Sequence, residues 1–266
     1  MCYDVSTQLS SQIKVARHQG ASAGEISFLE EKLLKLEQHR AGDEKFEHYF
    51  TSGFSHHKIP VITADKPNEL QLFNWGLIPF WVKDKAAAFK LSNQTLNARG
   101  ETIFEKPSFR AAAKSKRCLV VLSGYFEHYW ADSKGKRKIP YYIALKNKLP
   151  MYLSGLWEEW VDKETGEVIN TVAIVTTEAN KALAKVHNRN PNNPRMLNVI
   201  PNEIKHDWLT EIQTESQKEF VLSLIKPFPA EELIIYPVGQ LRGKNGLGDV
   251  PEAQQKIEYP DLELPF

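Results

Sequence analysis

Four apolar or aromatic runs in the middle of the chain constrain its fold more than any other feature. They cover Leu119–Tyr129, Pro140–Leu145, Met151–Trp160 and Val168–Thr177. Short polar segments separate them at 132–135, 146–148 and 162–166, and these segments contain the Asp, Asn and Gly residues that favour tight turns. Strands joined by such turns pair antiparallel. The sequence therefore predicts one α+β domain with an antiparallel β core.

Helices and further strands are expected around this core. A helix is predicted at 11–39, with an interruption near Gly20 and Gly24. Further helices are predicted at 103–113, 178–186, 201–212 and 217–224, and strands at 58–62, 70–77 and 233–238. Residues 78–100 are expected to be rich in loops. With no internal repeat or linker, we expect a single domain over 1–266, with a core at 2–246 and an acidic, proline-containing tail at 247–266.

The composition excludes several classes of protein. No run of about 18 apolar residues predicts a membrane span. The N-terminus has neither the basic start nor the apolar segment of a secretory signal, so a cytoplasmic protein is expected. Two cysteines do not make a disulfide scaffold. Cys118 lies in an apolar run and is expected in the core, whereas Cys2 is expected to stay reduced.

The second position carries the most distinctive chemistry. Removal of Met1, which is usual before a small residue, leaves a cysteine with a free α-amine and a thiol. That amine has a pKa near about 8, far below that of lysine, so a useful fraction is neutral at pH 7. The amine condenses with an aldehyde to a Schiff base, and the thiol closes a five-membered thiazolidine ring intramolecularly. Cys2 is therefore a candidate nucleophile toward aldehydes.

Four motifs accompany Met1-Cys2 in a specific order. They are NWGLIPFW at 74–81, NARGE at 97–101, CLVVLSGYFE at 118–127, and His187 followed by Arg195 and Met196. Together they resemble the SOS response associated peptidase (SRAP) family, also called abasic-site processing proteins. The resemblance extends from Cys2 to about Gly246 and implies the SRAP fold, in which the β core is barrel-like and the helices are peripheral.

The resemblance also implies a function and a set of site residues. Such proteins bind single-stranded DNA containing an abasic site and form a thiazolidine crosslink that protects the site in the DNA damage (SOS) response. By the family pattern, Cys2 is the nucleophile, Asn97 lies by its amine and the sugar, and Glu127 and His187 are the acid–base pair. The family also implies thiol peptidase (hydrolase) activity limited to removal of Met1, and Schiff-base chemistry adds a lyase activity.

A basic stretch supports a DNA partner independently. The segment from Trp81 to Arg117 contains nine Lys and Arg residues and three acidic ones. This is an excess of six positive charges in a chain whose net charge is only +1. Phosphate binding requires such local charge, and aromatic side chains within it stack on bases of single strands. The predicted DNA-binding residues are Arg99, by the family pattern a phosphate contact, and Trp75, Trp81, Lys83, Arg110 and Arg195.

The sequence departs from the family at three places. Many members continue Met-Cys with Gly-Arg, whereas Tyr3 and Asp4 follow here, so a phosphate-binding arginine near the N-terminus is missing. His128 follows Glu127 in place of Trp. The family pattern His-x-Arg-Met-Pro is stretched, which leaves either Arg189 or Arg195 in the arginine position, with Arg195 the better fit.

Three alternative functions remain open at this point. The first is a peptidase whose N-terminal cysteine removes Met1 autocatalytically. The second is a non-catalytic module that binds single-stranded DNA. The third is a metal site formed by His56 and His57 with His128 or His187, which lacks zinc-ligand spacing. We expect no metal and no cofactor, no membrane contact, and a cytoplasmic monomer that associates with the nucleoid through DNA.

Overall fold

A closed five-stranded barrel forms the centre of the computed structural model, which describes residues 2–18, 22–39, 45–132, 136–262 and 264–265. Its strands are, in order around the ring, β10 (Val168–Glu178), β4 (Gln71–Trp75), β3 (Lys58–Thr63), β6 (Arg117–Leu122) and β9 (Met151–Val161), which returns to β10. Neighbours are antiparallel except β4 and β10, which are parallel. The predicted α+β class and barrel-like core are confirmed, but the barrel is mixed and not purely antiparallel.

Three short strands extend the barrel sheet toward the candidate site. β5 (Asn97–Arg99) pairs parallel with β10, and β11 (Arg195–Leu197) pairs antiparallel with the end of the same strand. β12 (Val199–Ile200) pairs with β9. The parallel pairing of β5 was not expected, because 78–100 contains few of the residues that mark strands. β4 and β5 both pair in parallel with β10, β4 at Thr171 and Val172 and β5 at Ile174, Val175 and Thr176, so β5 lies further along the same strand.

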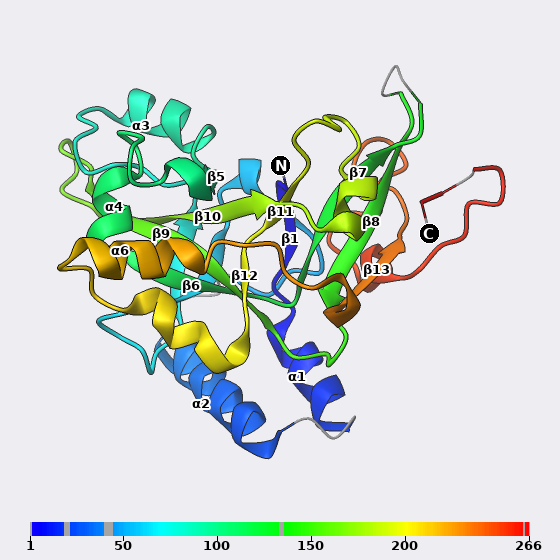
Figure 1. Ribbon diagram of the computed structural model, residues 1–266, viewed down its shortest axis with the longest axis horizontal. Helices are drawn as coiled ribbons and strands as arrows, with labels where there is room; N and C mark the ends of the chain where they lie inside the picture. The colour runs from blue at the N-terminus through cyan, green and yellow to red at the C-terminus, as the bar shows by residue number, and fades with distance from the viewer. Residues whose placement is uncertain (1, 19–21, 40–44, 133–135, 263, 266) are drawn as a thin grey trace.

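A second sheet packs beside the barrel and contains the N-terminal strand. Its order is β13 (Leu233–Pro237), β8 (Lys138–Leu145), β7 (Gly124–Trp130), β1 (Asp4–Ser6) and β2 (Thr51–Ser52). In Figure 1, β1 lies between the side that carries β5 and the β7–β8 hairpin. Because β1 lies between β7 and β2, it is paired on both sides.

The run expected as one strand at 119–129 is two strands, β6 and β7, which belong to different sheets. The chain passes from one to the other at Ser123 and Gly124. A Cβ atom at Gly124 would lie 2.6 Å from the ring of Tyr142, so only glycine permits this close approach. The apolar pattern continues without a break because both strands are buried, and periodicity alone therefore hides the boundary.

Helices cover the barrel at its periphery. They are α1 (Leu9–His18), α2 (Ala23–His39), α3 (Lys85–Ser92), α4 (Arg110–Ser115), α5 (Lys181–Val186) and α6 (Glu215–Ser223), with 3₁₀ turns η1 (Gly53–Ser55), η2 (Gly100–Thr102), η3 (Asn202–Leu209), η4 (Ala230–Glu232) and η5 (Pro251–Gln254). The helix predicted at 103–113 begins only at Arg110, and the one at 201–212 is a 3₁₀ helix. Helix α3 lies in the stretch expected to be loop. Asp84 caps α3 through a hydrogen bond from Ala87 N, a local signal that the sequence does contain.

Two hydrophobic clusters share the barrel strands. In β6, Leu119 and Val121 pack with residues of α1 and α2, whereas Val120 and Leu122 pack with residues of the second sheet. Cys118 belongs to the second cluster and is fully buried, as expected. Burial on both faces explains why the central runs read as continuous apolar segments.

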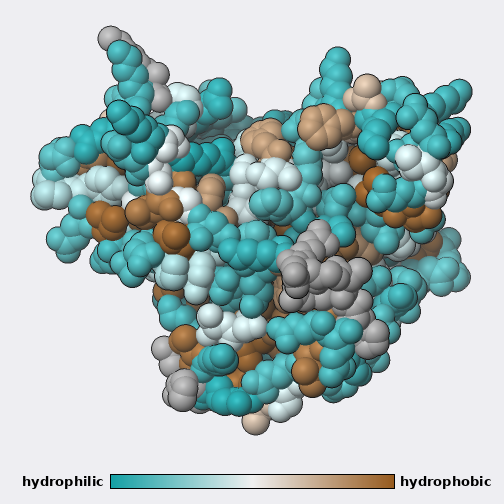
Figure 2. Space-filling model, turned by 180° about the vertical axis from the view of Figure 1, so that it is seen from behind, coloured by the Kyte–Doolittle hydropathy of each residue, from teal (hydrophilic) through white to brown (hydrophobic). Residues whose placement is uncertain are grey.

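The C-terminal segment from 247 contacts the folded core. The Asp249 carboxylate accepts hydrogen bonds from the backbone N–H groups of Tyr49 and Phe50, and Ile257 N donates to Pro237 O. Among the described residues, the helices are too short or too polar to cross a membrane. Figure 2 shows a surface on which hydrophilic residues predominate and hydrophobic ones form small groups.

Candidate active site

Cys2 lies directly before β1 and is held by the strand next to it. Asp4 pairs with Phe126 of β7, and the Cys2 Sγ lies 3.2 Å from the carbonyl oxygens of both Asp4 and Phe126. The single S–H can donate to either oxygen. The residue is only 3% exposed. Burial raises the pKa of the Cys2 thiol well above its usual value, and the nearby Glu127 carboxylate raises it further.

Asn97 binds the backbone of Cys2. Its Nδ2 donates a hydrogen bond of 2.6 Å to the Cys2 carbonyl oxygen. Asn97 is placed there by β5, where it pairs with Ile174 of β10. Its Oδ1 is buried and, within the described parts of the chain, accepts no hydrogen bond. A buried acceptor without a donor is costly, so this atom is available to a donor that enters the site.

Glu127 and His187 meet at one end of β7. Glu127 follows Phe126 in that strand, and His187 ends α5, which Asn180 caps. Both side chains are about nine-tenths buried, and Glu127 Oε2 lies 3.6 Å from His187 Nδ1. His187 Nδ1 also lies 3.1 Å from the backbone nitrogen of Arg195. The four predicted catalytic residues therefore converge from four separate segments of the chain.

An open cleft gives access to this group. Glu127 and His187 line it together with Tyr3, His128, Trp130, Lys138, Arg189 and Arg242, and its volume is about 460 Å³. Burial lowers the pKa of His128, which keeps the imidazole neutral at pH 7. A carboxylate and imidazoles beside a buried thiol can move protons during addition to a carbonyl.

Arg242 is a site residue that the sequence did not indicate. It donates to the buried carboxylate of Asp4 and, at 3.0 Å, to Ser52 Oγ. Arg242 thus brings a guanidinium to the cleft from a distant part of the chain, and its charge is paired with that of Asp4.

Four of the predicted DNA-binding residues are exposed. They are Trp81, Lys83, Arg99 and Arg110. Trp81 and Lys83 line one groove of about 600 Å³ with residues of α3. Arg99 ends β5 two residues after Asn97, so both side chains lie on the same face of the strand, and that of Arg99 is exposed. These positions are compatible with contact to a nucleic acid.

Trp75 and Arg195 do not fit their predicted roles as surface contacts. Trp75 is 1% exposed, and its Nε1 donates to Leu96 O within the core. A ring without a free face cannot stack on a base. Arg195 is 5% exposed; its guanidinium binds both carboxylate oxygens of Glu101 and donates to Thr176 O. Its charge is therefore used inside the protein, and of the two candidate arginines only Arg189 reaches the cleft.

The histidines suggested as metal ligands make other contacts. His56 Nδ1 bonds to Trp75 O at 2.6 Å, and His57 Nδ1 bonds to the Thr51 hydroxyl at 2.7 Å. In the segments that the structure describes, His, Cys, Asp and Glu side chains form no group of three that could hold a metal ion.

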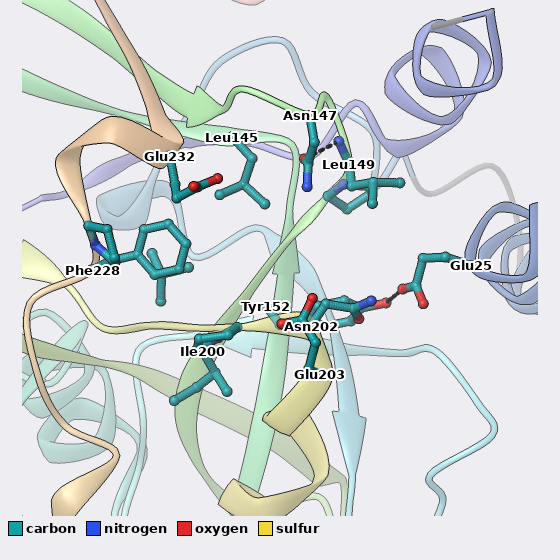
Figure 3. Close-up of a pocket in the computed structure, with 14 residues that line it drawn as sticks. Glu25, Leu145, Asn147, Leu149, Tyr152, Ile200, Asn202, Glu203, Phe228 and Glu232 are labelled. Atoms are coloured by element: carbon teal, nitrogen blue, oxygen red, sulfur yellow. Dashed lines mark hydrogen bonds between the residues drawn. The ribbon is translucent and has the colours of Figure 1, made fainter. Parts of the chain in front are cut away.

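A second cavity, of about 340 Å³, contains none of the predicted site residues. Figure 3 shows it between the β8–β9 turn, β12 and the segment before β13. Tyr152 donates to Glu25 Oε1 at 2.8 Å on one side, and Phe228 faces Leu145 on the other. We assign this cavity no chemistry.

Comparison with known proteins gives the same family that the motifs indicated. The family model described as "SOS response associated peptidase (SRAP)" matches residues 16–244. The chain belongs to the SRAP family. Cys2 lies before the matched region, so its place in the site depends on the β1–β7 pairing described above.

Similar proteins carry a consistent name. Over 183 residues the chain is 33% identical to the abasic site processing protein YoqW of Bacillus subtilis, covering 69% of this chain and 75% of that protein. It is 32% identical over 201 residues to YoaM of the same organism, also named an abasic site processing protein, covering 75% and 82%. A crystal structure of a protein from Bacteroides thetaiotaomicron matches with a TM-score of 0.73 and 32% identity, over 97% of this chain and all of that one.

Proposed function

We propose that this SRAP protein processes abasic sites by linking Cys2 covalently to the sugar aldehyde of single-stranded DNA. One observation carries the proposal: Asn97 binds the backbone of Cys2 beside a cleft that holds Glu127 and His187. The names of YoqW and YoaM support the abasic site as substrate. The proposal requires that Met1, which precedes Cys2, is removed.

The reaction forms two new bonds to one carbon atom of the sugar. The Cys2 amine adds to C1′ of the open-chain sugar, and the resulting hydroxyl leaves as water after it gains a proton, which gives an iminium ion. Sγ then adds to the iminium carbon and loses its proton. The product is a thiazolidine ring, and the overall change is loss of one water. Ring closure is favoured because the thiol is part of the same residue as the amine.

Glu127 and His187 serve the proton transfers. Opening of the closed sugar and departure of water each need an acid, and addition of the thiol needs a base. Glu127 is close enough to Cys2 to influence its thiol, and it contacts His187 at 3.6 Å. The carboxylate and the imidazole can therefore each take part in proton transfers with the reacting groups. Asn97 orients Cys2 through its Nδ2, and its unused Oδ1 accepts from the released amine.

The single strand is held by the exposed basic and aromatic residues. Arg99, Arg110 and Lys83 bind phosphates, and Trp81 stacks on a base. A flexible single strand brings its unpaired sugar into the cleft more readily than a duplex. A role in the SOS response, the monomeric state and a cytoplasmic, nucleoid-associated location stay predictions.

Incubation of the protein with an oligonucleotide that contains one abasic site tests this function. The expected product is a heat-stable protein–DNA adduct on a denaturing gel. Cys2→Ala should give no adduct, whereas Cys118→Ala, which removes the other thiol, should give adduct at the level of the parent. An adduct of equal yield from Cys2→Ala would contradict the proposal.

A second activity, removal of Met1 by the protein itself, is favoured by the family description, which names a peptidase. In that reaction the Cys2 thiol and the adjacent Glu127 act on the Met1–Cys2 bond. Met1 can be removed by the protein itself or by a cellular methionine aminopeptidase. The intact mass of Cys2→Ala distinguishes these two routes when the variant is produced in cells that lack methionine aminopeptidase activity on this sequence. Retention of Met1 in the variant and its loss in the parent would support self-processing.

Weak strand cleavage belongs to the same chemistry. A Schiff base at an abasic site also permits β-elimination, so another amine of the protein can give lyase activity in Cys2→Ser or Cys2→Ala. Trapping with borohydride, which reduces the imine, should capture that intermediate. Absence of both cleavage and trapping would exclude the lyase role.

A further inference from the structure

Two cations share one tryptophan ring at the edge of the cleft. Lys138 Nζ lies 4.7 Å from the centroid of the Trp130 ring, and Arg189 Cζ lies 4.9 Å from it. All three side chains line the cleft that holds Glu127 and His187. Arg189 is one of the two candidates for the arginine of the family pattern, whereas Trp130 and Lys138 belong to none of the motifs that predicted DNA binding and have no role in the proposed reaction.

The backbone holds this group in place from two elements. Trp130 and Lys138 are partners in the β7–β8 pairing. Asn188, next to Arg189, accepts from Trp130 N at 2.8 Å and donates to Trp130 O at 2.9 Å. Both backbone groups of Trp130 are therefore bound by one side chain, which fixes the loop that carries Arg189 against the strand that carries the ring. The arrangement is built by the fold and does not depend on flexible side chains alone.

Among the described residues, neither cation has a carboxylate partner. In the part of the chain that the structure describes, Lys138 and Arg189 form no ion pair, whereas Arg137 pairs with Asp261 and Arg242 pairs with Asp4. The carboxylate that faces the same cleft, Glu127, contacts His187. Two unpaired like charges around one ring repel each other, and an anion that binds both removes that cost. The geometry therefore favours an anionic ligand.

We propose that Trp130, Lys138 and Arg189 form a phosphate clamp. The Trp130 ring orients the two cations, and the cations bind the DNA backbone next to the abasic nucleotide. This inference rests on the proposed function, because it takes single-stranded DNA as the ligand. The guanidinium of Arg189 can bind two phosphate oxygens at once, and Lys138 adds a compact charge. Contact of the cations with the ring orients both before DNA arrives, which lowers the entropy lost on binding.

The clamp gives the strand a second point of attachment. The exposed residues of the predicted stretch lie on the side of β5 and α3, whereas the clamp lies on the β7–β8 hairpin. Figure 1 places these two regions on opposite sides of the N-terminal strand. A strand bound at both would pass the N-terminal strand β1, which Cys2 directly precedes. The clamp thereby explains how a sugar is positioned at the nucleophile without recognition of any base.

The clamp is tested by non-covalent binding of an undamaged single-stranded oligonucleotide. Binding is measured in a Cys2→Ala background at several salt concentrations. Each phosphate contact on a single strand contributes about 0.7 to the slope of log affinity against log salt. Lys138→Gln and Arg189→Gln should each lower the slope by about that amount. Lys146→Gln, an exposed lysine at the opposite end of β8, is the matched control and should leave the slope unchanged. Unchanged slopes in both clamp variants, or an equal drop in the control, would overturn the proposal.

The role of the ring is separated by a double-mutant cycle. Trp130→Leu should weaken binding several-fold in the parent background, and Trp130→Phe should restore part of it, because phenylalanine also attracts cations. In a background that carries both Lys138→Gln and Arg189→Gln, Trp130→Leu should have no further effect. A further loss of affinity in that background would mean that the ring stacks on a base, and the proposal that Trp130 orients the two cations would be wrong.

Failure of the clamp and failure of the proposed function give different results. If no protein forms an adduct with abasic DNA, the proposed function fails, while the salt slopes still report on the clamp. If the parent forms the adduct and the clamp variants show parental salt slopes, the clamp fails and the function stands.

Discussion

Asn97 donates a hydrogen bond of 2.6 Å to the carbonyl oxygen of Cys2, although 95 residues separate them in the chain. The contact joins the N-terminal segment, which belongs to the second sheet, to β5, which extends the barrel. The backbone of the proposed nucleophile is thus fixed by both sheets. An N-terminus that is usually mobile is held here by a buried side chain, which favours a defined approach of the amine to its substrate.

Loss of the acid–base pair should slow adduct formation without preventing it. Glu127→Gln and His187→Gln each remove a proton-transfer group, and the rate with abasic DNA should fall by about 10²-fold. The measurement is a single-turnover time course of adduct formation at saturating DNA. Glu159→Gln, an exposed carboxylate on β9, is the control and should react at the parental rate. Parental rates in both cleft variants would remove these residues from the mechanism.

Alkylation of Cys2 should report its raised pKa. Below the pKa of a thiol the thiolate fraction grows with pH, and a raised pKa makes that fraction smaller at every such pH. In the DNA-free protein the logarithm of the iodoacetamide rate at Cys2 should rise linearly with pH beyond 9.0, the ordinary value of a thiol. In the unfolded chain the rate should level off near that value. Peptide mass spectrometry identifies the modified residue, and levelling below pH 8 in the folded protein would contradict the burial argument.

Arg195 and Arg189 should have opposite phenotypes. Arg195→Met removes buried hydrogen bonds to Glu101 and Thr176, so the free energy of unfolding should fall by about 2 kcal/mol. Arg189→Gln, at a partly exposed position, should change it by less than about 0.5 kcal/mol while it weakens DNA binding. Denaturant unfolding and DNA titration of both variants check this. If Arg195→Met were as stable as the parent but bound DNA more weakly, Arg195 would be the arginine that contacts phosphate, and this account would be contradicted.

The two tryptophans should likewise separate stability from binding. Trp75→Ala removes a fully buried ring and should cost about 3–5 kcal/mol of folding free energy. Trp81→Ala removes an exposed ring and should cost about 1–3 kcal/mol of binding free energy for single-stranded DNA. Thermal unfolding and anisotropy titrations give both quantities. Unchanged DNA binding in Trp81→Ala would exclude a stacking role.

The strands were more predictable than the helices, for physical reasons. Strands buried on both faces, such as β9 and β10, appear in the sequence as continuous apolar runs. Helix α3 buries only Ala88 and Ser92 and leaves apolar residues such as Phe89 exposed, so no apolar stripe of helical period marks it. The division of 119–129 into β6 and β7 depends on a close contact between Gly124 and Tyr142, which no local pattern encodes.

The catalytic group was predictable only through the family motifs, and the binding residues only in part. Nothing local in Asn97 or His187 indicates chemistry, because an amide in a turn and a histidine after a helix have ordinary structural uses. Trp75 and Trp81 lie in one motif, yet only the fold decides that the first is core and the second is surface. Arg242 and Trp130 could not be found, since their partners Asp4 and Arg189 are distant in sequence.

The intact mass of the adduct tests the central claim most directly. After reaction with an abasic oligonucleotide, the species should have the mass of the chain without Met1 plus the DNA, less one water, and fragmentation should place the DNA on Cys2. An adduct that retains Met1, or that forms equally well when the Cys2 sulfur is absent, would contradict the account.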